Sequence, residues 1–280
     1  MDSDSLTERL SRRDPSLVMG IVNVTPDSFA DGGRFVKPAD AVSHAAQLVA
    51  EGADILDVGG ESTRPGAAAV SVDEELDRVI PVIERLAREF DVPVSVDTSK
   101  AMVIREAVAT GAQMINDVCA LESEGALTTA AGLGVPVCLM HMQGEPRSMQ
   151  DEPAYENVTT EVVNYLRGRI EASLAAGIES CNIIIDPGFG FGKTLEHNLQ
   201  LLRELECIAG LDFPVLVGLS RKSMIGTITG RDVGDRLAGS LALALLAAQK
   251  GAAIIRVHDV GPTVDVLKIL RRMVHENEMG

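Results

Sequence analysis

The chain has 280 residues, of which 46% are apolar and 3% aromatic, and its formal net charge at pH 7 is −16. That apolar fraction excludes a disordered chain and suffices for one large core, so we expect one main domain. The negative charge argues against a nucleic-acid surface, which needs clustered Lys and Arg. The longest apolar run, residues 237–248, contains Gly239 and Ser240 and is too short to span a bilayer. We therefore expect a soluble, cytoplasmic protein without nucleic-acid or membrane partners.

Short β-branched apolar runs recur along the chain, and each is followed by a loop and then a helical pattern. The runs begin near Val18, Ile55, Pro93, Met114, Val137, Ile183, Val215 and Ile254. Continuous apolar runs are typical of strands buried on both faces. Eight such units predict an α/β fold, a single (β/α)8 TIM barrel over residues 16–280, with residues 1–15 as a polar N-terminal arm that we expect to be frayed. An open, doubly wound sheet is the alternative.

Local signals mark several helix boundaries between these runs. Ser71 and Glu74 have the spacing of a capping box, and Pro38 suits a first helical turn. Gly52, Gly111 and Gly251 each precede a strand, where glycine adopts the left-handed conformation that ends a helix. The four cysteines form no CxxC pair, so we expect reduced and mostly buried thiols.

Each expected strand ends in a polar side chain, and in such barrels the active site forms at these ends. In chain order the polar residues are Asn23, Asp57, Asp97, Asn116 with Asp117, His141, Asp186, Ser220 with Arg221 and Lys222, and Arg256 with His258 and Asp259. Any one of them could be a turn or cap residue. A turn or cap role does not explain Arg256, because it lies inside an apolar run and a buried Arg needs an anionic or planar partner.

The residue types indicate a polar heterocycle that carries a diphosphate. Asp97, Asn116 and Asp186 can accept hydrogen bonds from a flat ring that presents N–H and NH₂ groups. Donors for an anion come from Asn23, Lys222, Arg256 and His258. With Mg²⁺, hard oxygen ligands and substrate phosphates usually share the coordination sphere.

Three other features have less specific meanings. The run Asp186–Thr194 ends like a phosphate-binding P-loop, but Pro187 occupies a position where that motif requires Gly, so we reject it. Lys222 could instead form a Schiff base, although nearby carboxylates should keep it protonated. His141 and His44 have no second His at metal-binding spacing, which favours packing or surface roles.

Seven segments in chain order resemble the motifs of the dihydropteroate synthases, a pterin-binding family of bacterial folate synthesis. They are Met19–Phe29, Asp57–Gly66, Ser95–Thr98, Ile115–Asp117, Asp186–Phe191, Ser220–Ser223 and Ile255–Asp259. The resemblance implies a homodimeric transferase. It would condense (7,8-dihydropterin-6-yl)methyl diphosphate with 4-aminobenzoate to give 7,8-dihydropteroate and diphosphate.

The resemblance also implies a role for each matching residue. The catalytic set is Asp97, Asp186, Lys222 and Arg256. The pterin diphosphate would contact Asn23, Thr63, Asp97, Asn116, Asp186, Lys222, Arg256, Val257 and His258, with Mg²⁺ at Asn23. The 4-aminobenzoate would contact Phe29, Thr63, Arg64, Pro65, Phe191 and Ser220, and Asp57 would lie near the phosphates.

The implied mechanism is dissociative loss of diphosphate followed by attack of the aniline nitrogen, without a nucleophilic side chain. Three other functions remain open. They are a methyltransferase domain that presents a methylated folate to a corrinoid, a paralogue that binds pterin without turnover, and a Schiff-base aldolase using Lys222.

Overall fold

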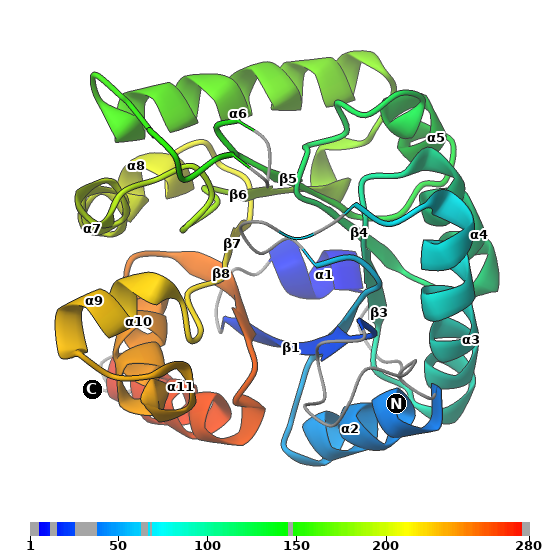
Figure 1. The fold of residues 1–280 in the computed structure, drawn as a ribbon, viewed down its shortest axis with the longest axis horizontal. Coiled ribbons are helices and arrows are strands. Elements are labelled where there is room, and N and C mark those ends of the chain that lie inside the picture. The colour runs from blue at the N-terminus through cyan, green and yellow to red at the C-terminus, as the bar shows by residue number, and fades with distance from the viewer. Residues whose placement is uncertain are drawn as a thin grey trace.

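Eight parallel strands close into a barrel in the computed structural model, which describes residues 6–11, 16–25, 38–62, 67, 69–144 and 148–275 (Figure 1). The strands are β1 (Leu17–Asn23), β2 (Ile55–Gly59), β3 (Val94–Asp97), β4 (Met114–Asp117), β5 (Val137–Met140), β6 (Ile183–Asp186), β7 (Val215–Val217) and β8 (Ala252–Val257). Each strand pairs with its neighbours in sequence, and β8 closes the ring on β1 with Leu17 opposite Ile254. The predicted TIM barrel is confirmed, and the open sheet is wrong.

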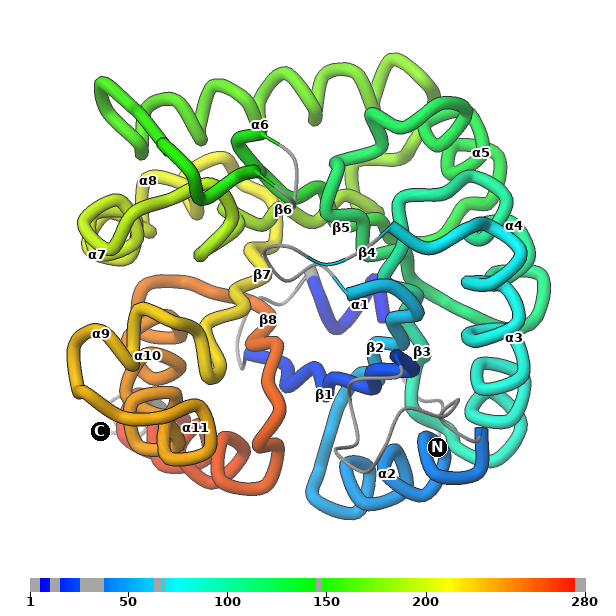
Figure 2. Tube along the Cα trace, in the orientation of Figure 1, coloured from blue at the N-terminus to red at the C-terminus, as the bar shows by residue number. Residues whose placement is uncertain are grey.

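Helices surround the ring of strands, as the tube in Figure 2 shows. The surrounding helices are α2 (Pro38–Ala50), α3 (Val72–Glu89), α4 (Ala101–Thr110), α5 (Ala126–Ala131), α6 (Val158–Ala175), α7 (Leu195–Arg203), α8 (Leu205–Ala209), α9 (Ser223–Thr229), α10 (Leu237–Gln249) and α11 (Val260–His275), whereas α1 (Leu6–Ser11) lies across the ring. Two short 3₁₀ helices, Ser180–Asn182 and Val233–Asp235, precede β6 and α10. No helix in these described segments is long and apolar enough to cross a membrane.

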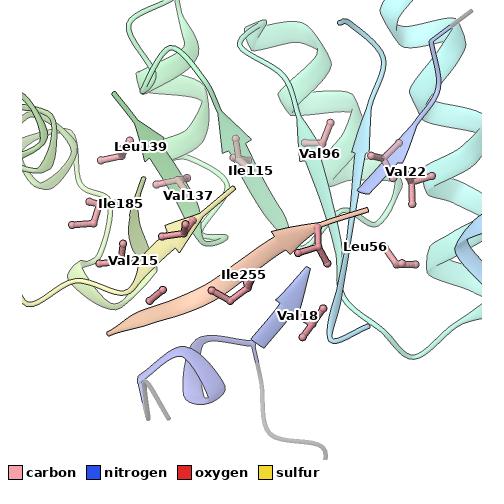
Figure 3. Packing of buried hydrophobic residues seen from close by; sticks show 14 of the residues in the cluster. Val18, Val22, Leu56, Val96, Ile115, Val137, Leu139, Ile185, Val215 and Ile255 are labelled. Atoms are coloured by element: carbon pink, nitrogen blue, oxygen red, sulfur yellow. The ribbon is translucent and has the colours of Figure 1, made fainter. Parts of the chain in front are cut away.

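The main core lies between the strands and the surrounding helices. Alternate strand residues point outward into it, among them Val22, Val96, Ile115 and Ile185 (Figure 3). The other face of each strand points into the barrel, so both faces are buried. This double burial explains why the strands are continuous apolar runs in the sequence.

A second, smaller cluster fills the lower part of the barrel, and we call it the apolar floor. It consists of Leu6, Leu10, Leu17, Met19, Ile55, Met114, Cys138, Ile184, Leu216 and Ile254. Leu6 and Leu10 come from α1, which crosses the ring of strands in Figure 1. The expectation of a frayed arm is therefore wrong for residues 6–11, because burial of these two leucines fixes a short helix against the floor.

Several local predictions can be compared directly with the helix ends. The Ser71 side chain accepts a hydrogen bond from the backbone of Glu74 at 3.2 Å, but the Glu74 side chain pairs with Arg78 instead of completing a capping box. Gly111 ends α4 with φ 126°, as predicted for a glycine that ends a helix. All four cysteines are unpaired, yet Cys181 and Cys207 are exposed, so the expectation of mostly buried thiols is wrong for those two.

Candidate active site

Polar side chains lie inside the barrel directly above the apolar floor. The floor residues Ile55, Met114, Ile184 and Ile254 are each followed two positions later on the same strand by a polar residue. Residues two apart on a strand share a face, so these polar residues also point into the barrel. With Asp97 of β3 they form a set that we call the polar ring, namely Asp57, Asp97, Asn116, Asp186 and Arg256.

Arg256 connects two carboxylates of the polar ring. Its Nε donates to Asp57 Oδ2 at 2.6 Å, and one terminal nitrogen donates to Asp97 Oδ2 at 2.8 Å. The Asn116 amide donates to the same Asp57 oxygen at 3.0 Å. The anionic partner expected for a buried Arg is thus present twice within the chain itself. These contacts hold the guanidinium, which β8 carries, against side chains of β2 and β3.

Burial makes ionisation of these carboxylates costly. It raises the pKa of Asp97 to about 7, an effect that Arg256 opposes and the Asp57 charge reinforces. Burial also raises the pKa of Asp186, against the Gly188 N–H that donates to its Oδ1 at 2.7 Å and the charge of Lys222. Such a site favours a ligand that brings N–H donors or positive charge to the two carboxylates.

Lys222 extends the polar ring on the β7 side. Its ammonium donates to the carbonyl oxygen of Phe189 and lies 4.4 Å from the centre of the Phe191 ring. Burial lowers the pKa of Lys222 to about 8, although Asp186 opposes this. Neighbouring carboxylates alone predict a protonated Lys222, because the sequence does not show this cost of burial. A pKa near 8 still leaves the amine mostly protonated at pH 7.

Ser220 and His258 form a separate pair at the ends of β7 and β8. The Ser220 hydroxyl lies 3.0 Å from His258 Nδ1 and accepts from the His258 backbone at 3.2 Å. Beside them Arg221 donates to Asp259 at 3.0 Å. The imidazole is therefore held in place just after the end of β8, and only Val257 separates His258 from Arg256 in the sequence. The two residues present adjacent donor groups for an anion.

Comparison with known proteins gives the family of this chain. The pterin binding enzyme family matches residues 19–258. Dihydropteroate synthase from Escherichia coli (strain K12) is 53% identical over 261 residues, which cover 93% of this chain and 93% of that protein. The chain belongs to the dihydropteroate synthase family. The transferase reaction predicted from the motifs, formation of 7,8-dihydropteroate with loss of diphosphate, is the reaction of this family, so the predicted enzyme class is confirmed.

Solved structures of the dihydropteroate synthase from Xanthomonas albilineans are also closely similar. The structure with 4-aminobenzoic acid has 55% identity and a TM-score of 0.89, and the similarity covers 94% of both chains. The structure with 7,8-dihydropteroate has 49% identity and a TM-score of 0.84, again covering 94% of both chains. The barrel predicted from the sequence is therefore the fold of the dihydropteroate synthases.

The structure brings together many of the residues that the dihydropteroate synthase motifs predict for the site. Those in or beside the polar ring are Asp97, Asn116, Asp186, Lys222, Arg256 and Phe191, with Ser220 and His258 as the adjoining pair. Val257 differs, because its side chain lies in the core between strands and helices and only its backbone faces the site. Four predicted residues, Phe29, Thr63, Arg64 and Pro65, lie outside the described residues.

Asp57 has a larger part in the polar ring than the sequence predicts. The resemblance places it near the phosphates, and in the structure it is fully buried and accepts hydrogen bonds from both Arg256 and Asn116. Its second oxygen, Oδ1, is buried without a hydrogen-bond partner in the described part of the chain. A signal was available in the sequence. The spacing from Ile55 to Asp57 repeats that from Ile184 to Asp186, which places both carboxylates at one level.

The donors available for a metal are few. Asn23, at the end of β1, offers one neutral amide oxygen and is paired in register with Gly59, which in turn is paired with Asp97. Within the described ranges no group of three or more His, Cys, Asp or Glu residues could hold a metal ion. His141 contacts Lys193 instead, at 2.9 Å. A single amide oxygen fits Mg²⁺ when most of the ion's ligands are phosphate and water oxygens.

Proposed function

We propose that the polar ring binds the pterin of (7,8-dihydropterin-6-yl)methyl diphosphate and that 4-aminobenzoate replaces the diphosphate there. The observation that carries this proposal is the buried set of carboxylates and one amide around Arg256. The Xanthomonas albilineans relatives, solved with 4-aminobenzoic acid and with 7,8-dihydropteroate, support the same pair of substrate and product.

The pterin would lie across the ring with its N–H and NH₂ groups toward the carboxylates. Asp97 and Asp186 accept from these donors, and Asn116 adds an amide oxygen because its nitrogen already donates to Asp57. Lys222, above the Phe191 ring, donates to an acceptor atom of the pterin. Two buried carboxylates with raised pKa values gain most from a ligand that supplies N–H donors.

Bond cleavage places positive charge next to these carboxylates. The carbon–oxygen bond of the methylene breaks, and its electron pair leaves with the diphosphate. The pterin ring delocalises the cation, and the charges of Asp97 and Asp186 stabilise it. The aniline nitrogen then forms the new carbon–nitrogen bond and loses one proton. Positioning of the two substrates supplies the remaining rate enhancement, since no covalent enzyme intermediate is involved.

The leaving diphosphate would bind on the β8 and β1 side of the site. A guanidinium has five N–H donors, and two of those on Arg256 are used by Asp57 and Asp97, which leaves donors for the anion. His258 and the backbone at Val257 complete this subsite. Asn23 would hold Mg²⁺, which when bound neutralises charge on the diphosphate oxygens. Arg256, His258 and the backbone at Val257 would orient the diphosphate away from the carboxylates.

The 4-aminobenzoate would enter from the loops above β2, β6 and β7. Phe191 provides an apolar wall, and Ser220 provides a hydroxyl beside His258. Phe29, Thr63, Arg64 and Pro65 are assigned to the same subsite by the family motifs. An aromatic amine held between a phenyl ring and the exposed methylene carbon is correctly placed for attack.

A homodimer is the assembly that we propose. Helices α10 and α11 expose large apolar side chains, among them Leu237, Leu246, Ile269 and Met273, with Met273 69% exposed. Apolar side chains gathered on neighbouring helices are typical of a subunit interface. Light scattering of the wild type and of Leu246→Glu tests this assembly, and a monomeric wild type would contradict it.

A cytoplasmic location remains the prediction from the sequence.

The decisive experiment measures diphosphate release from the pterin diphosphate with Mg²⁺, with and without 4-aminobenzoate. We expect release coupled to dihydropteroate formation, and we expect its loss in Lys222→Met but not in the matched surface variant Lys268→Met. Pterin binding without release would favour a paralogue without turnover. Methyl transfer to a corrinoid, or a borohydride-trapped adduct on Lys222, would identify the other two alternatives.

A further inference from the structure

Lys193 is a buried lysine to which the reaction described above gives no role. It follows the glycine-rich segment after β6 and is only 3% exposed. Its Nζ lies 2.9 Å from His141 Nδ1 and donates to the carbonyl oxygens of Gly188 and Phe191, both also at 2.9 Å. A longer contact of 3.4 Å joins it to the His141 carbonyl oxygen, and all four partner atoms belong to uncharged groups.

The two carbonyls that Lys193 binds are the ends of a turn, residues 188–191, which we call the pterin-side turn. Within it the Phe191 N–H donates to the Gly188 carbonyl at 3.1 Å. On the other side the Gly190 N–H donates to Asn198 Oδ1 at 2.7 Å. Lys193 and Asn198 therefore hold this turn from beneath, and His141 connects the turn to the end of β5.

The groups that the pterin-side turn presents to the barrel mouth are those that orient the proposed pterin ligands. Gly188 N–H donates to the Asp186 carboxylate at 2.7 Å. Phe189 provides the carbonyl that accepts from the Lys222 ammonium, and Phe191 provides the ring beneath that ammonium. A displacement of the turn would therefore move the hydrogen-bond partners of two pterin-binding side chains together.

The glycines of this segment leave the turn little freedom of its own. A Cβ on Gly188 would lie 1.9 Å from the His141 carbonyl oxygen, and one on Gly192 would lie 2.3 Å from the Gln143 carbonyl oxygen. The β5 and β6 loops thus touch backbone to backbone, and the Lys193 side chain fills the space at their junction. This contact, rather than phosphate binding, accounts for the run that resembles a P-loop.

We propose that Lys193 is a positioning residue for pterin binding, which acts by fixing the pterin-side turn and through it Asp186 and Lys222. The proposal rests on the proposed function, because it takes the pterin to bind at those two residues. Arg256 and His258 lie on β8 and the loop after it, and Lys193 has no contact with either among the described residues. Lys193 should consequently affect the pterin side of the substrate and not the diphosphate side.

The test compares Lys193→Met and Lys193→Gln with the exposed control Lys268→Met. Binding of pterin-6-carboxylate and of pyrophosphate with Mg²⁺ is measured separately by calorimetry, after circular dichroism has shown that each variant is folded. We expect Lys193→Met to weaken pterin binding at least tenfold and to leave pyrophosphate binding within twofold. Lys193→Gln keeps two N–H donors and should therefore lose less pterin affinity than Lys193→Met. An equal loss of affinity for both ligands, or unchanged affinity for both, would overturn the proposal.

A second measurement needs no ligand and separates this proposal from the proposed function. The ¹³Cε resonance of Lys222, identified by its disappearance in Lys222→Met, should shift in Lys193→Gln but not in Lys268→Met. If the wild type binds no pterin, the proposed function fails, and this resonance still tests whether Lys193 acts on Lys222. An unchanged resonance in a folded Lys193→Gln variant would overturn the positioning role whatever the ligand.

Discussion

Replacing Asp97 by Asn should stabilise the ligand-free protein while it slows the reaction. Burial raises the pKa of Asp97 from 3.8 to about 7, so the folded protein holds a proton there that the unfolded chain releases. Protonation thus favours the folded state below pH 7. This contribution to stability is complete below pH ~4, the pKa of an unfolded Asp, and is lost as the pH rises toward about 7.

The size of the effect follows from the difference between these two pKa values. Each pH unit between about 4 and 7 lowers the free energy of unfolding of the wild type by about 1.4 kcal/mol, at most about 4 kcal/mol in all. The amide introduced by Asp97→Asn has no acidic proton to lose and resembles the protonated carboxyl in shape. The stability of the variant relative to the wild type should therefore increase by about 2 kcal/mol between pH 5 and pH 7. Arg256 keeps Asp57 as a partner at 2.6 Å in either case.

Urea denaturation of both proteins at pH 5, 6, 7 and 8 measures this difference. Asp91→Asn is the matched control, because Asp91 is exposed and lies just before the same strand, β3. The control should show a difference from wild type that does not change with pH. If the free energy of unfolding of Asp97→Asn differs from that of the wild type by the same amount at every pH, the Asp97 carboxyl is already ionised in the folded protein at pH 5. The argument from burial is then refuted. Undiminished kcat in this variant would remove Asp97 from the catalytic set.

Four further substitutions test other parts of the structure. Lys222→Ala should lower kcat/KM by about a hundredfold, as loss of a positioned charge does, and wild-type rates of dihydropteroate formation would exclude Lys222 from the site. Leu10→Ala should lower the free energy of unfolding by about 3 kcal/mol in urea, because Leu10 is 1% exposed in the apolar floor; no change would mean that α1 is dispensable. Gly188→Ala should cost at least about 3 kcal/mol in the same assay, since its Cβ would meet the His141 carbonyl at 1.9 Å and its φ is +67°. Gly168→Ala in α6, where a Cβ meets nothing within 4 Å, should instead be neutral or stabilising by about 0.5–1 kcal/mol.

The barrel was predictable because each strand is buried on both faces. Ile55, Met114 and Ile183 begin strands where the apolar runs predicted, and elsewhere the difference is at most two residues, as for β8, which begins at Ala252 rather than Ile254. The level of each side chain inside the barrel was predictable too, from the two-residue step that separates Ile184 from Asp186. That step also identifies Asp57 as part of the polar ring.

Other features depend on contacts that the local sequence does not contain. A six-residue helix such as α1 is not stable alone, so only the apolar floor explains why Leu6 and Leu10 are ordered. Lys193 resembles a P-loop lysine by its neighbours, while its partner His141 is 52 residues away. The lowered pKa of Lys222 likewise results from burial, which charge counting along the sequence does not measure.

If the pterin binds at the polar ring as we propose, the ring and Lys222 stabilise the charge that develops in the reaction more than the substrate itself. Three carboxylates, Asp57, Asp97 and Asp186, lie beside Arg256 and Lys222, with Lys193 behind Asp186. Burial is the main cause of the raised pKa of Asp97, which the Asp57 charge reinforces and Arg256 opposes. These carboxylates repel a diphosphate, whereas they attract a cation on the pterin methylene. Cleavage relieves both effects at once, so the ring stabilises the transition state more than the bound substrate, which is the condition for raising kcat.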